Sequence, residues 1–324
     1  PGMLPFLFRD YFWLDICSDA GIAMRFQNSI IPDAVQRAYN VTILTATAVS
    51  GGFSGAAVFQ TTTSDGRALA VRRTPKAVAL PPERMRRLYG LLRQISQCGC
   101  RGIPLQLLPA DTETQVRRSE NRTVVPWVQV EDCIWQMEPW MPGSSLAGHE
   151  LTTPHLTAAL TALNQFHQWA TEAVRVVGSD DWFLNAMRPS PAILRRLSIV
   201  GELQTGLLKK LRHQMSEDPD ERFRSLAVRV CEALTAWLPW LQRELTALST
   251  IAFRIQPVLR DIWRAHVLFT DYEVTGLIDL SAAASDHGIC EVAGGKRRGL
   301  VSRKRFAVFE HHFPIYQEDE CFDR

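Results

Sequence analysis

The sequence lacks any long uninterrupted apolar stretch. A membrane-spanning helix needs about 20 consecutive apolar residues, and charged residues break every apolar run here before that length. The N-terminal segment is apolar, but Arg9, Asp10 and Asp15 interrupt it, so it does not resemble a signal peptide. We therefore predict no membrane span, and we expect residues 1–31 to be a leader without stable structure.

Net charge is also nearly absent. The 36 Lys and Arg residues balance the 34 Asp and Glu residues to a formal charge of +2. A chain so close to neutral does not favour nucleic acid or an anionic membrane as its main partner. Residues 296–305 contain six Lys and Arg, but no aromatic residues are interleaved with them, which favours a solvated tail over a nucleic-acid site.

The sequence has no cysteine pattern typical of a zinc site or a disulfide framework. Its seven cysteines are scattered and odd in number. Cys98 and Cys100 lie too close together for the usual zinc spacing, and no second pair accompanies them. We interpret the cysteines as free thiols in a reducing cytoplasm.

The first half of the chain has the pattern of an antiparallel sheet with one helix. Apolar and β-branched residues predict strands at 41–49, 56–62, 68–73, 122–130 and 132–138, with a hairpin turn at Ser64–Gly66. Pro81 and Pro82 begin a helix whose apolar residues recur at helical spacing. Residues 141–145 then break the pattern, and we place the domain boundary there.

The second half is mainly helical. Thr153 and Pro154 begin an amphipathic helix, and further helical patterns cover residues 191–214 and 221–247. Three short strands follow at 255–259, 265–269 and 274–278. From residue 284 onward the pattern is lost, and a truncated or frame-shifted coding sequence would explain this change.

Two aspartates lie at the edges of these last strands. Asp261 follows the strand at 255–259, and Asp279 ends the strand at 274–278. Carboxylates at neighbouring strand ends can share a divalent metal, or can act as one base and one metal ligand. The alternative is structural, since aspartate is also common in turns.

A glycine-rich turn lies between the first two predicted strands. It consists of Gly51, Gly52, Phe53, Ser54 and Gly55. Glycines allow backbone N–H groups to approach phosphate oxygens closely, although a plain hairpin has the same composition. It is not a Walker loop, because no Gly-Lys-Ser/Thr follows. Arg72, on the strand at 68–73, is placed where its charge can reach the phosphates of a bound nucleotide.

Together these features resemble the aminoglycoside phosphotransferase family, a protein-kinase-like group that includes choline and homoserine kinases. Leu259-Arg260-Asp261 stands where that family has His-Gly-Asp, and Leu277-Ile278-Asp279-Leu280 stands for its metal-binding motif. The resemblance covers residues 45–283. It implies a two-lobed α+β kinase-like fold, with a nucleotide-binding lobe at 32–140, a helical lobe with the catalytic loop at 141–283, and an atypical tail at 284–324.

The resemblance also implies roles for individual residues. Asp261 would orient or deprotonate the hydroxyl group of a small-molecule substrate, and Asp279 would hold Mg²⁺ against the phosphates of ATP. Gly51–Gly55 would cover the phosphates. Glu138 and Trp140 would belong to the hinge beside the adenine, and helices at 151–250 would form the acceptor pocket.

Three residues depart from the family pattern. His266 occupies the asparagine position five residues after Asp261, where it can bind metal, contact phosphate or simply pack. Arg72 replaces the strand lysine. Glu83 lies in the first helical turn, where a role in balancing the helix dipole is favoured over an ion pair with Arg72. These departures leave a catalytically inactive kinase-like nucleotide-binding module as the alternative function.

Overall fold

The computed structural model describes residues 30–49, 55–110, 125–146, 152–179 and 182–288. The predicted leader lies almost entirely outside the described residues, as do Gly51, Gly52, Phe53 and Ser54 of the glycine-rich turn. Residues 289–324 of the predicted tail lie outside them too. No helix within the described ranges is long and apolar enough to cross a membrane.

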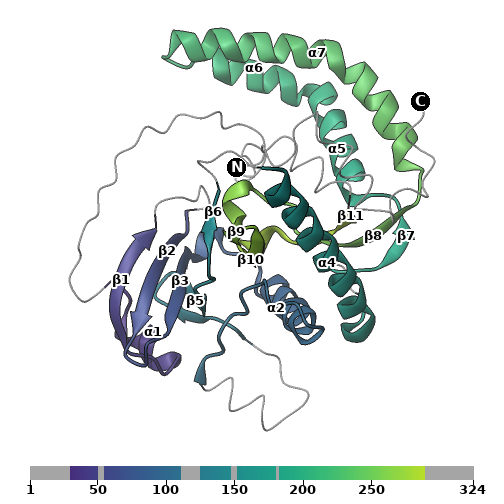
Figure 1. The fold of residues 1–324 in the computed structure, drawn as a ribbon. Helices are drawn as coiled ribbons and strands as arrows, with labels where there is room; N and C mark the ends of the chain where they lie inside the picture. Colours follow the sequence, from purple (N-terminus) through teal and green to yellow (C-terminus); the bar gives the residue numbers. More distant parts are fainter. Residues whose placement is uncertain (1–29, 50–54, 111–124, 147–151, 180–181, 289–324) are drawn as a thin grey trace.

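The first lobe is a five-stranded antiparallel sheet (Figure 1). Its strands lie in the order β1 (Ile43–Val49), β2 (Ala57–Thr63), β3 (Ala68–Pro75), β5 (Cys133–Pro139) and β4 (Val128–Val130). The sheet contains all five strands predicted from the sequence, although the observed β4 is much shorter than the predicted strand at 122–130.

The two faces of this sheet have different environments because successive side chains of a strand point to opposite sides. One face packs against α1 (Asp33–Ala38) in a core that includes Phe59, Val71, Trp135 and Met137. The other face carries Arg72 on β3, with Gln136 and Glu138 on β5. This second face turns toward the rest of the molecule and borders the candidate site.

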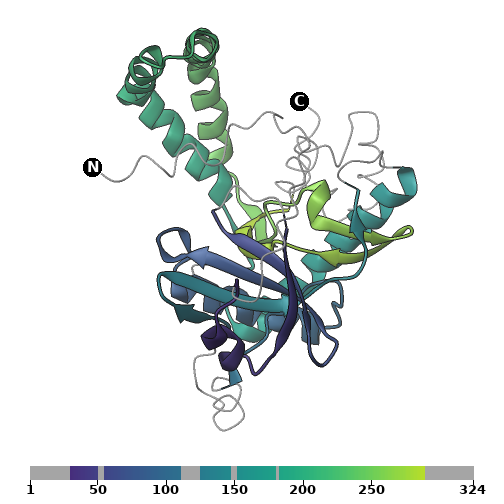
Figure 2. The same ribbon diagram turned by 90° about the vertical axis from the view of Figure 1, so that its left-hand side faces the viewer.

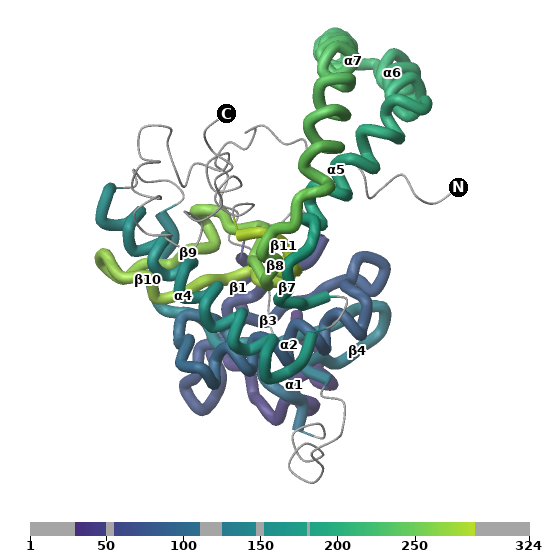
Figure 3. The backbone as a smooth tube through the Cα atoms, turned by 90° about the vertical axis from the view of Figure 1, so that its right-hand side faces the viewer, coloured from purple at the N-terminus to yellow at the C-terminus, as the bar shows by residue number. Residues whose placement is uncertain are grey.

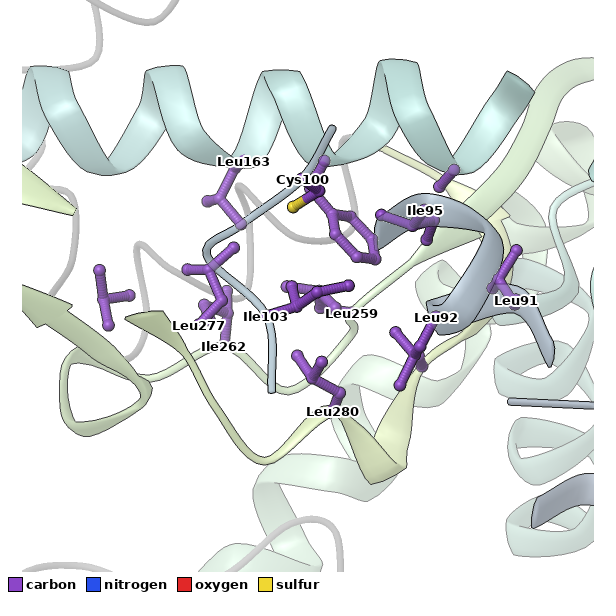
Figure 4. Packing of buried hydrophobic residues seen from close by; sticks show 14 of the residues in the cluster. Leu91, Leu92, Ile95, Cys100, Ile103, Leu163, Leu259, Ile262, Leu277 and Leu280 are labelled. Carbon is purple, nitrogen blue, oxygen red and sulfur yellow. The ribbon is translucent and has the colours of Figure 1, made fainter. Parts of the chain in front are cut away.

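Helix α2 (Pro82–Gln97) lies between the sheet and the second lobe. Proline suits its first turn because that position needs no intrahelical N–H bond. Leu88, Leu91, Leu92 and Ile95 form its apolar face, and they pack into the main core of the second lobe. Figure 4 shows Leu91, Leu92 and Ile95 gathered with Leu163 of the helix opposite and with Leu259 and Leu280 of the second lobe. Met85, near the start of the helix, packs with Trp127 and Ile134 of the first lobe, so α2 contacts both lobes.

The chain enters the second lobe through residues 141–145, where we expected a boundary. Ser144–Ser145 form the short strand β6, which pairs with β9. Gly143 has φ +91°, and a Cβ there would lie 2.6 Å from the Phe269 carbonyl oxygen. Only glycine fits this crossing without displacing the backbone of β9.

The second lobe combines helix α4 (Thr153–Val177) with two small antiparallel sheets. One sheet has the order β10 (Glu273–Leu277), β9 (Val267–Thr270), β6, and the other has the order β11 (Ala284–His287), β8 (Phe253–Val258), β7 (Ala186–Arg188). The three strands predicted around the aspartates are confirmed as β8, β9 and β10. Strand β11 follows directly after residue 283 and pairs with β8.

A helical arm projects from this lobe, as Figures 2 and 3 show. It consists of α5 (Pro191–Glu202), the π-helical turn η2 (Leu203–Leu207), α6 (Leu208–Ser216) and α7 (Glu221–Ser249). The helical pattern predicted at 191–214 is present as α5, η2 and α6, but Gly206, with φ 130°, introduces a kink between the two α-helices. The arm has a small core of its own around Val200, Leu208, Cys231 and Leu238.

Candidate active site

Asp261 is positioned by the loop that follows β8. Leu259 and Ile262, on either side of it, are buried in the main core. Arg260 has φ 66°, a left-handed conformation that is uncommon for a residue other than glycine. The Asp261 carboxylate accepts a hydrogen bond from Trp263 Nε1 at 2.8 Å. Two buried anchors, a sharp turn and this bond together fix the direction of the carboxylate.

Asp279 ends the segment after β10 and also has a left-handed backbone, with φ 57° and ψ 52°. Its Oδ1 accepts hydrogen bonds from Arg72 Nη2 at 3.0 Å and from Ser281 Oγ at 3.2 Å. Burial alone would raise the pKa of Asp279, but Arg72, His266 and Ser281 together lower it below its usual value. Asp279 is therefore ionised at neutral pH.

His266 lies between the two aspartates. It ends the short 3₁₀ helix η3 (Arg264–His266), and its Nδ1 lies 2.9 Å from the carbonyl oxygen of Asp261. A carbonyl oxygen only accepts, so Nδ1 carries the proton and donates. The other ring nitrogen, Nε2, lies 3.7 Å from Asp279 Oδ2. Burial and the nearby Arg72 lower the pKa of His266, against the opposing effect of Asp279, so the ring is neutral at pH 7.

Arg72 and Glu138 bring charge to the site from the first lobe. The register of β3 and β5 pairs Ala70 with Glu138 and Arg72 with Gln136, so that all four lie on the inner side of the sheet. Burial raises the pKa of Glu138 to about 7, with Arg72 opposing the shift and Asp279 adding to it. Arg72 is thus the cation shared by two carboxyl groups from different lobes.

A cavity of about 180 Å³ lies beside these groups. Arg72, Glu138 and Asp279 line it together with Ser281. Its other walls are mainly apolar and come from α2, from the segment before α2 and from β5, including Val78, Leu80, Met85, Leu88, Leu92 and Ile134. The cavity therefore combines a charged wall with an apolar interior, as small-molecule sites commonly do.

The structure brings together only some of the residues expected to bind nucleotide. Gly55 is described and has φ 72°, but the other four residues of the glycine-rich turn are outside the described residues. Glu138 faces the cavity. Trp140 is half-buried, its backbone N–H donates to Ala68 O at 3.0 Å, and it does not line the cavity.

Two contributors were missed from the sequence. Ser281 was recognisable as a hydroxyl two residues after Asp279. Arg84 on α2 gave no such signal, because its partners are far away in the chain. It donates to the carbonyl oxygens of Ser281 and Ala283, at 3.2 Å each, and its guanidinium lies over the Trp182 ring. Arg84 thereby ties α2 to η4 (Leu280–Ala282), the turn that follows Asp279.

Glu83 does not pair with Arg72 in this structure. Its carboxylate forms ion pairs with Arg86 and Arg87 of the same helix. The sequence had favoured a local role for Glu83 at the start of α2, and these contacts agree with it. The cation on β3 instead pairs with Asp279.

Among solved structures, the fold is similar to those of several phosphotransferases. Spectinomycin phosphotransferase APH(9)-Ia, in complex with ADP and spectinomycin, has 12% sequence identity and a TM-score of 0.59, with 86% of this chain and 77% of that chain covered. A thermostable mutant of aminoglycoside phosphotransferase APH(4)-Ia has 15% identity and a TM-score of 0.51, with 84% and 80% covered. These likenesses confirm the two-lobed kinase-like fold predicted from the sequence.

The sequence comparisons found a family but no individual curated relative. No curated protein matched the chain. The profile of the phosphotransferase enzyme family, in contrast, matches residues 45–302, which include most of the first lobe, the second lobe with its arm, Asp261 and Asp279. The chain therefore belongs to the phosphotransferase enzyme family.

Proposed function

We propose that this protein transfers the γ-phosphoryl group of ATP to a hydroxyl group of a small molecule, with a divalent metal ion as cofactor. One observation carries the proposal: His266 donates to the backbone carbonyl of Asp261 and lies 3.7 Å from the carboxylate of Asp279, while Arg72 from the other lobe pairs with Asp279. Phosphoryl transfer depends mainly on positioning and on charge neutralisation, and this cluster supplies groups for both.

Each charged group has a distinct role in this reaction. Arg72 donates to phosphate oxygens of the nucleotide. Asp279 and His266 would hold the metal ion, for which the family resemblance implies Mg²⁺, and the ion would neutralise charge on the phosphates. The donors fit a metal, because a carboxylate oxygen and an imidazole nitrogen face each other at 3.7 Å. Asp261 orients the acceptor hydroxyl and accepts its proton.

The acceptor pocket lies on the side of Asp261 and the arm. Arg260 and Arg264 flank Asp261, and residues 182–266 contain thirteen Lys and Arg against eight Asp and Glu. Relatives of the fold bind hydroxylated antibiotics, namely spectinomycin in one structure and hygromycin B in another. For this chain, the excess of basic residues favours a neutral or anionic hydroxyl compound over a polycation.

A cytoplasmic location is part of the proposal. ATP is the phosphoryl donor of that compartment. Cys98, Cys100, Cys133 and Cys231 are all free thiols, as expected for a reducing environment.

The test measures nucleotide binding and turnover separately. Binding of a non-hydrolysable ATP analogue is followed by calorimetry, and ATP consumption is then measured against a panel of neutral, anionic and cationic hydroxyl compounds. For Asp261→Asn we expect unchanged nucleotide binding and a loss of turnover of at least about a hundredfold. Asp271→Asn is the control, since Asp271 is an exposed aspartate in the β9–β10 turn and is not part of the cluster of Arg72, His266 and Asp279.

The outcomes separate the alternatives. Turnover that depends on Asp261 supports the phosphotransferase. Nucleotide binding without turnover of any compound would instead favour the inactive nucleotide-binding module. Absence of nucleotide binding in the wild-type protein would contradict both.

A further inference from the structure

The two carboxylate oxygens of Asp279 have different surroundings. Oδ1 accepts from both Arg72 and Ser281. Oδ2 faces His266 Nε2 at 3.7 Å, which is too long for a hydrogen bond. Arg72 therefore neutralises one side of the carboxylate and leaves the other directed at the imidazole ring.

The tautomer of His266 is fixed by its other contact. Because Nδ1 donates its proton to the carbonyl oxygen of Asp261, the lone pair of the neutral ring is on Nε2. The nitrogen that carries this lone pair lies 3.7 Å from Oδ2 of Asp279. Metal ions bind such atoms at about 2.0–2.2 Å, so two donors 3.7 Å apart can contact a single ion.

The hydrogen bond from His266 Nδ1 to the Asp261 carbonyl has the form found in metal sites. A histidine that binds a metal commonly donates its other ring N–H to a backbone carbonyl or a carboxylate, which orients the ring. Here the carbonyl acceptor belongs to Asp261 itself. The position of a metal ligand and the backbone of the proposed base are therefore mechanically connected.

We propose that His266 Nε2 and Asp279 Oδ2 bind one divalent ion, and that the nitrogen ligand shifts the metal preference of the site from Mg²⁺ toward first-row transition-metal ions such as Mn²⁺. Mg²⁺ is a hard ion that prefers oxygen ligands. Imidazole binds first-row transition-metal ions more strongly than Mg²⁺, and Mn²⁺, which also accepts oxygen ligands, is the weakest binder of that series. Asparagine, which the family has at this position, would offer an amide oxygen. The inference rests on the proposed function, because it concerns the metal of the same site.

The test uses Mn²⁺ as the probe, since it is paramagnetic. Full-length protein is titrated with Mn²⁺, with and without a non-hydrolysable ATP analogue, and free Mn²⁺ is measured by electron paramagnetic resonance. Mg²⁺ competition gives the ratio of the two affinities. Pulsed measurements then detect ¹⁴N nuclei coupled to the bound ion.

Two variants make the comparison specific. In His266→Asn, the amide can still donate to the Asp261 carbonyl, but the nitrogen ligand is gone. His213→Asn is the control, because His213 is an exposed residue of α6. We expect an imidazole ¹⁴N signal in the wild-type and His213→Asn proteins and its loss in His266→Asn. The Mn²⁺ to Mg²⁺ affinity ratio should fall by about tenfold or more in His266→Asn.

Several results would overturn the inference. One is a wild-type spectrum without an imidazole signal, and another is a signal that persists in His266→Asn. An equal Mn²⁺ to Mg²⁺ affinity ratio in the wild-type and His266→Asn proteins would also contradict the inference. Failure of the ATP analogue to bind to the wild-type protein would contradict the proposed function. A wild-type protein that binds the analogue but shows no role of His266 in Mn²⁺ binding would contradict this inference alone.

Discussion

The body of the second lobe and the arm of α5–α7 are packed very differently. The body has one large core that joins α2, α4 and the loops around both aspartates, with Phe166 and Val267 fully buried. The arm buries only a small cluster and leaves Trp237 57% and Trp240 45% exposed. At its base, Ser190 Oγ donates to the buried Asp286 of β11 at 2.6 Å.

This difference indicates how the molecule divides its tasks. The loops of Asp261 and Asp279 are anchored by Leu259, Ile262, Leu277 and Leu280 in the best-packed region, so their geometry is held rigidly. The arm has few buried contacts and can vary without disturbing them. We therefore expect chemistry and global stability to depend on the body, and acceptor selection to depend on the arm.

The largest effect is expected from Asp279→Asn in the body. Asparagine tolerates the left-handed backbone, but it removes the charge that pairs with Arg72. We expect kcat/KM for phosphoryl transfer to fall by about a thousandfold, measured in a coupled ATPase assay. Asp218→Asn in the arm is the control, and it should change the rate less than about twofold. Retention of activity within tenfold in Asp279→Asn would break the comparison.

Core truncations test the packing difference directly. Phe166→Ala removes a fully buried ring of α4, and we expect a loss of about 3–5 kcal/mol in the free energy of unfolding. Leu238→Ala in the arm, with a smaller side chain in a smaller core, should cost about 2 kcal/mol. Urea unfolding measures both. Equal costs would show that the arm is as tightly coupled to the fold as the body.

Glu138→Gln is expected to change the pH dependence of the free energy of unfolding, by an amount smaller than the cost of Phe166→Ala. The pKa of Glu138 is raised to about 7 by burial, above the value of about 4.3 for an exposed glutamate. Between these values the folded protein binds more protons than the unfolded chain, so this group lowers the free energy of unfolding as pH rises.

Glutamine does not titrate, so the variant should gain stability relative to wild type as pH increases from about 5 to about 8. Between pH 5 and pH 8, the free energy of unfolding of Glu138→Gln relative to wild type should rise by an amount on the order of 1–3 kcal/mol, measured by urea unfolding at each pH. His266 titrates in both proteins, and its contribution cancels in the difference. A constant difference across the series would refute the perturbed pKa of Glu138.

The smallest effects are expected from Trp237→Ala and Trp240→Ala. The two rings contact each other edge to face, at 5.4 Å between centroids, and both are largely exposed. Each substitution should cost less than about 1 kcal/mol of stability. Nucleotide affinity, measured by calorimetry, should not change, while the KM for the acceptor should. A changed nucleotide affinity would show that the arm communicates with the nucleotide site.

Local patterns predicted the elements around the site well. The β9–β10 hairpin was expected from two short apolar runs separated by Thr270–Glu273, and its observed strands differ by only one or two residues at their ends. The local role of Glu83 followed from its place in the first turn of a helix. Such features depend on neighbours in the sequence, which is why one chain was enough to predict them.

The contacts that define the candidate site were not predictable in the same way. Arg72 and Asp279 are 207 residues apart, and nothing in either segment indicates that they pair. The sequence showed that Arg72 replaces the strand lysine, but which residue pairs with Arg72 depends on how the sheet faces the second lobe. The kink at Gly206 also escaped prediction, since helices often tolerate an isolated glycine.

The attachment of α2 has a mechanical consequence. Leu88, Leu91, Leu92 and Ile95 belong to the core of the second lobe, and Arg84 bonds the helix to the carbonyl oxygens of Ser281 and Ala283, while Met85 packs toward the sheet. In a hinge motion of the lobes, α2 should therefore move with the second lobe, and the five-stranded sheet should rotate relative to α2 as a rigid body. The moving boundary would then run along the inner face of the sheet, between Arg72 and Asp279.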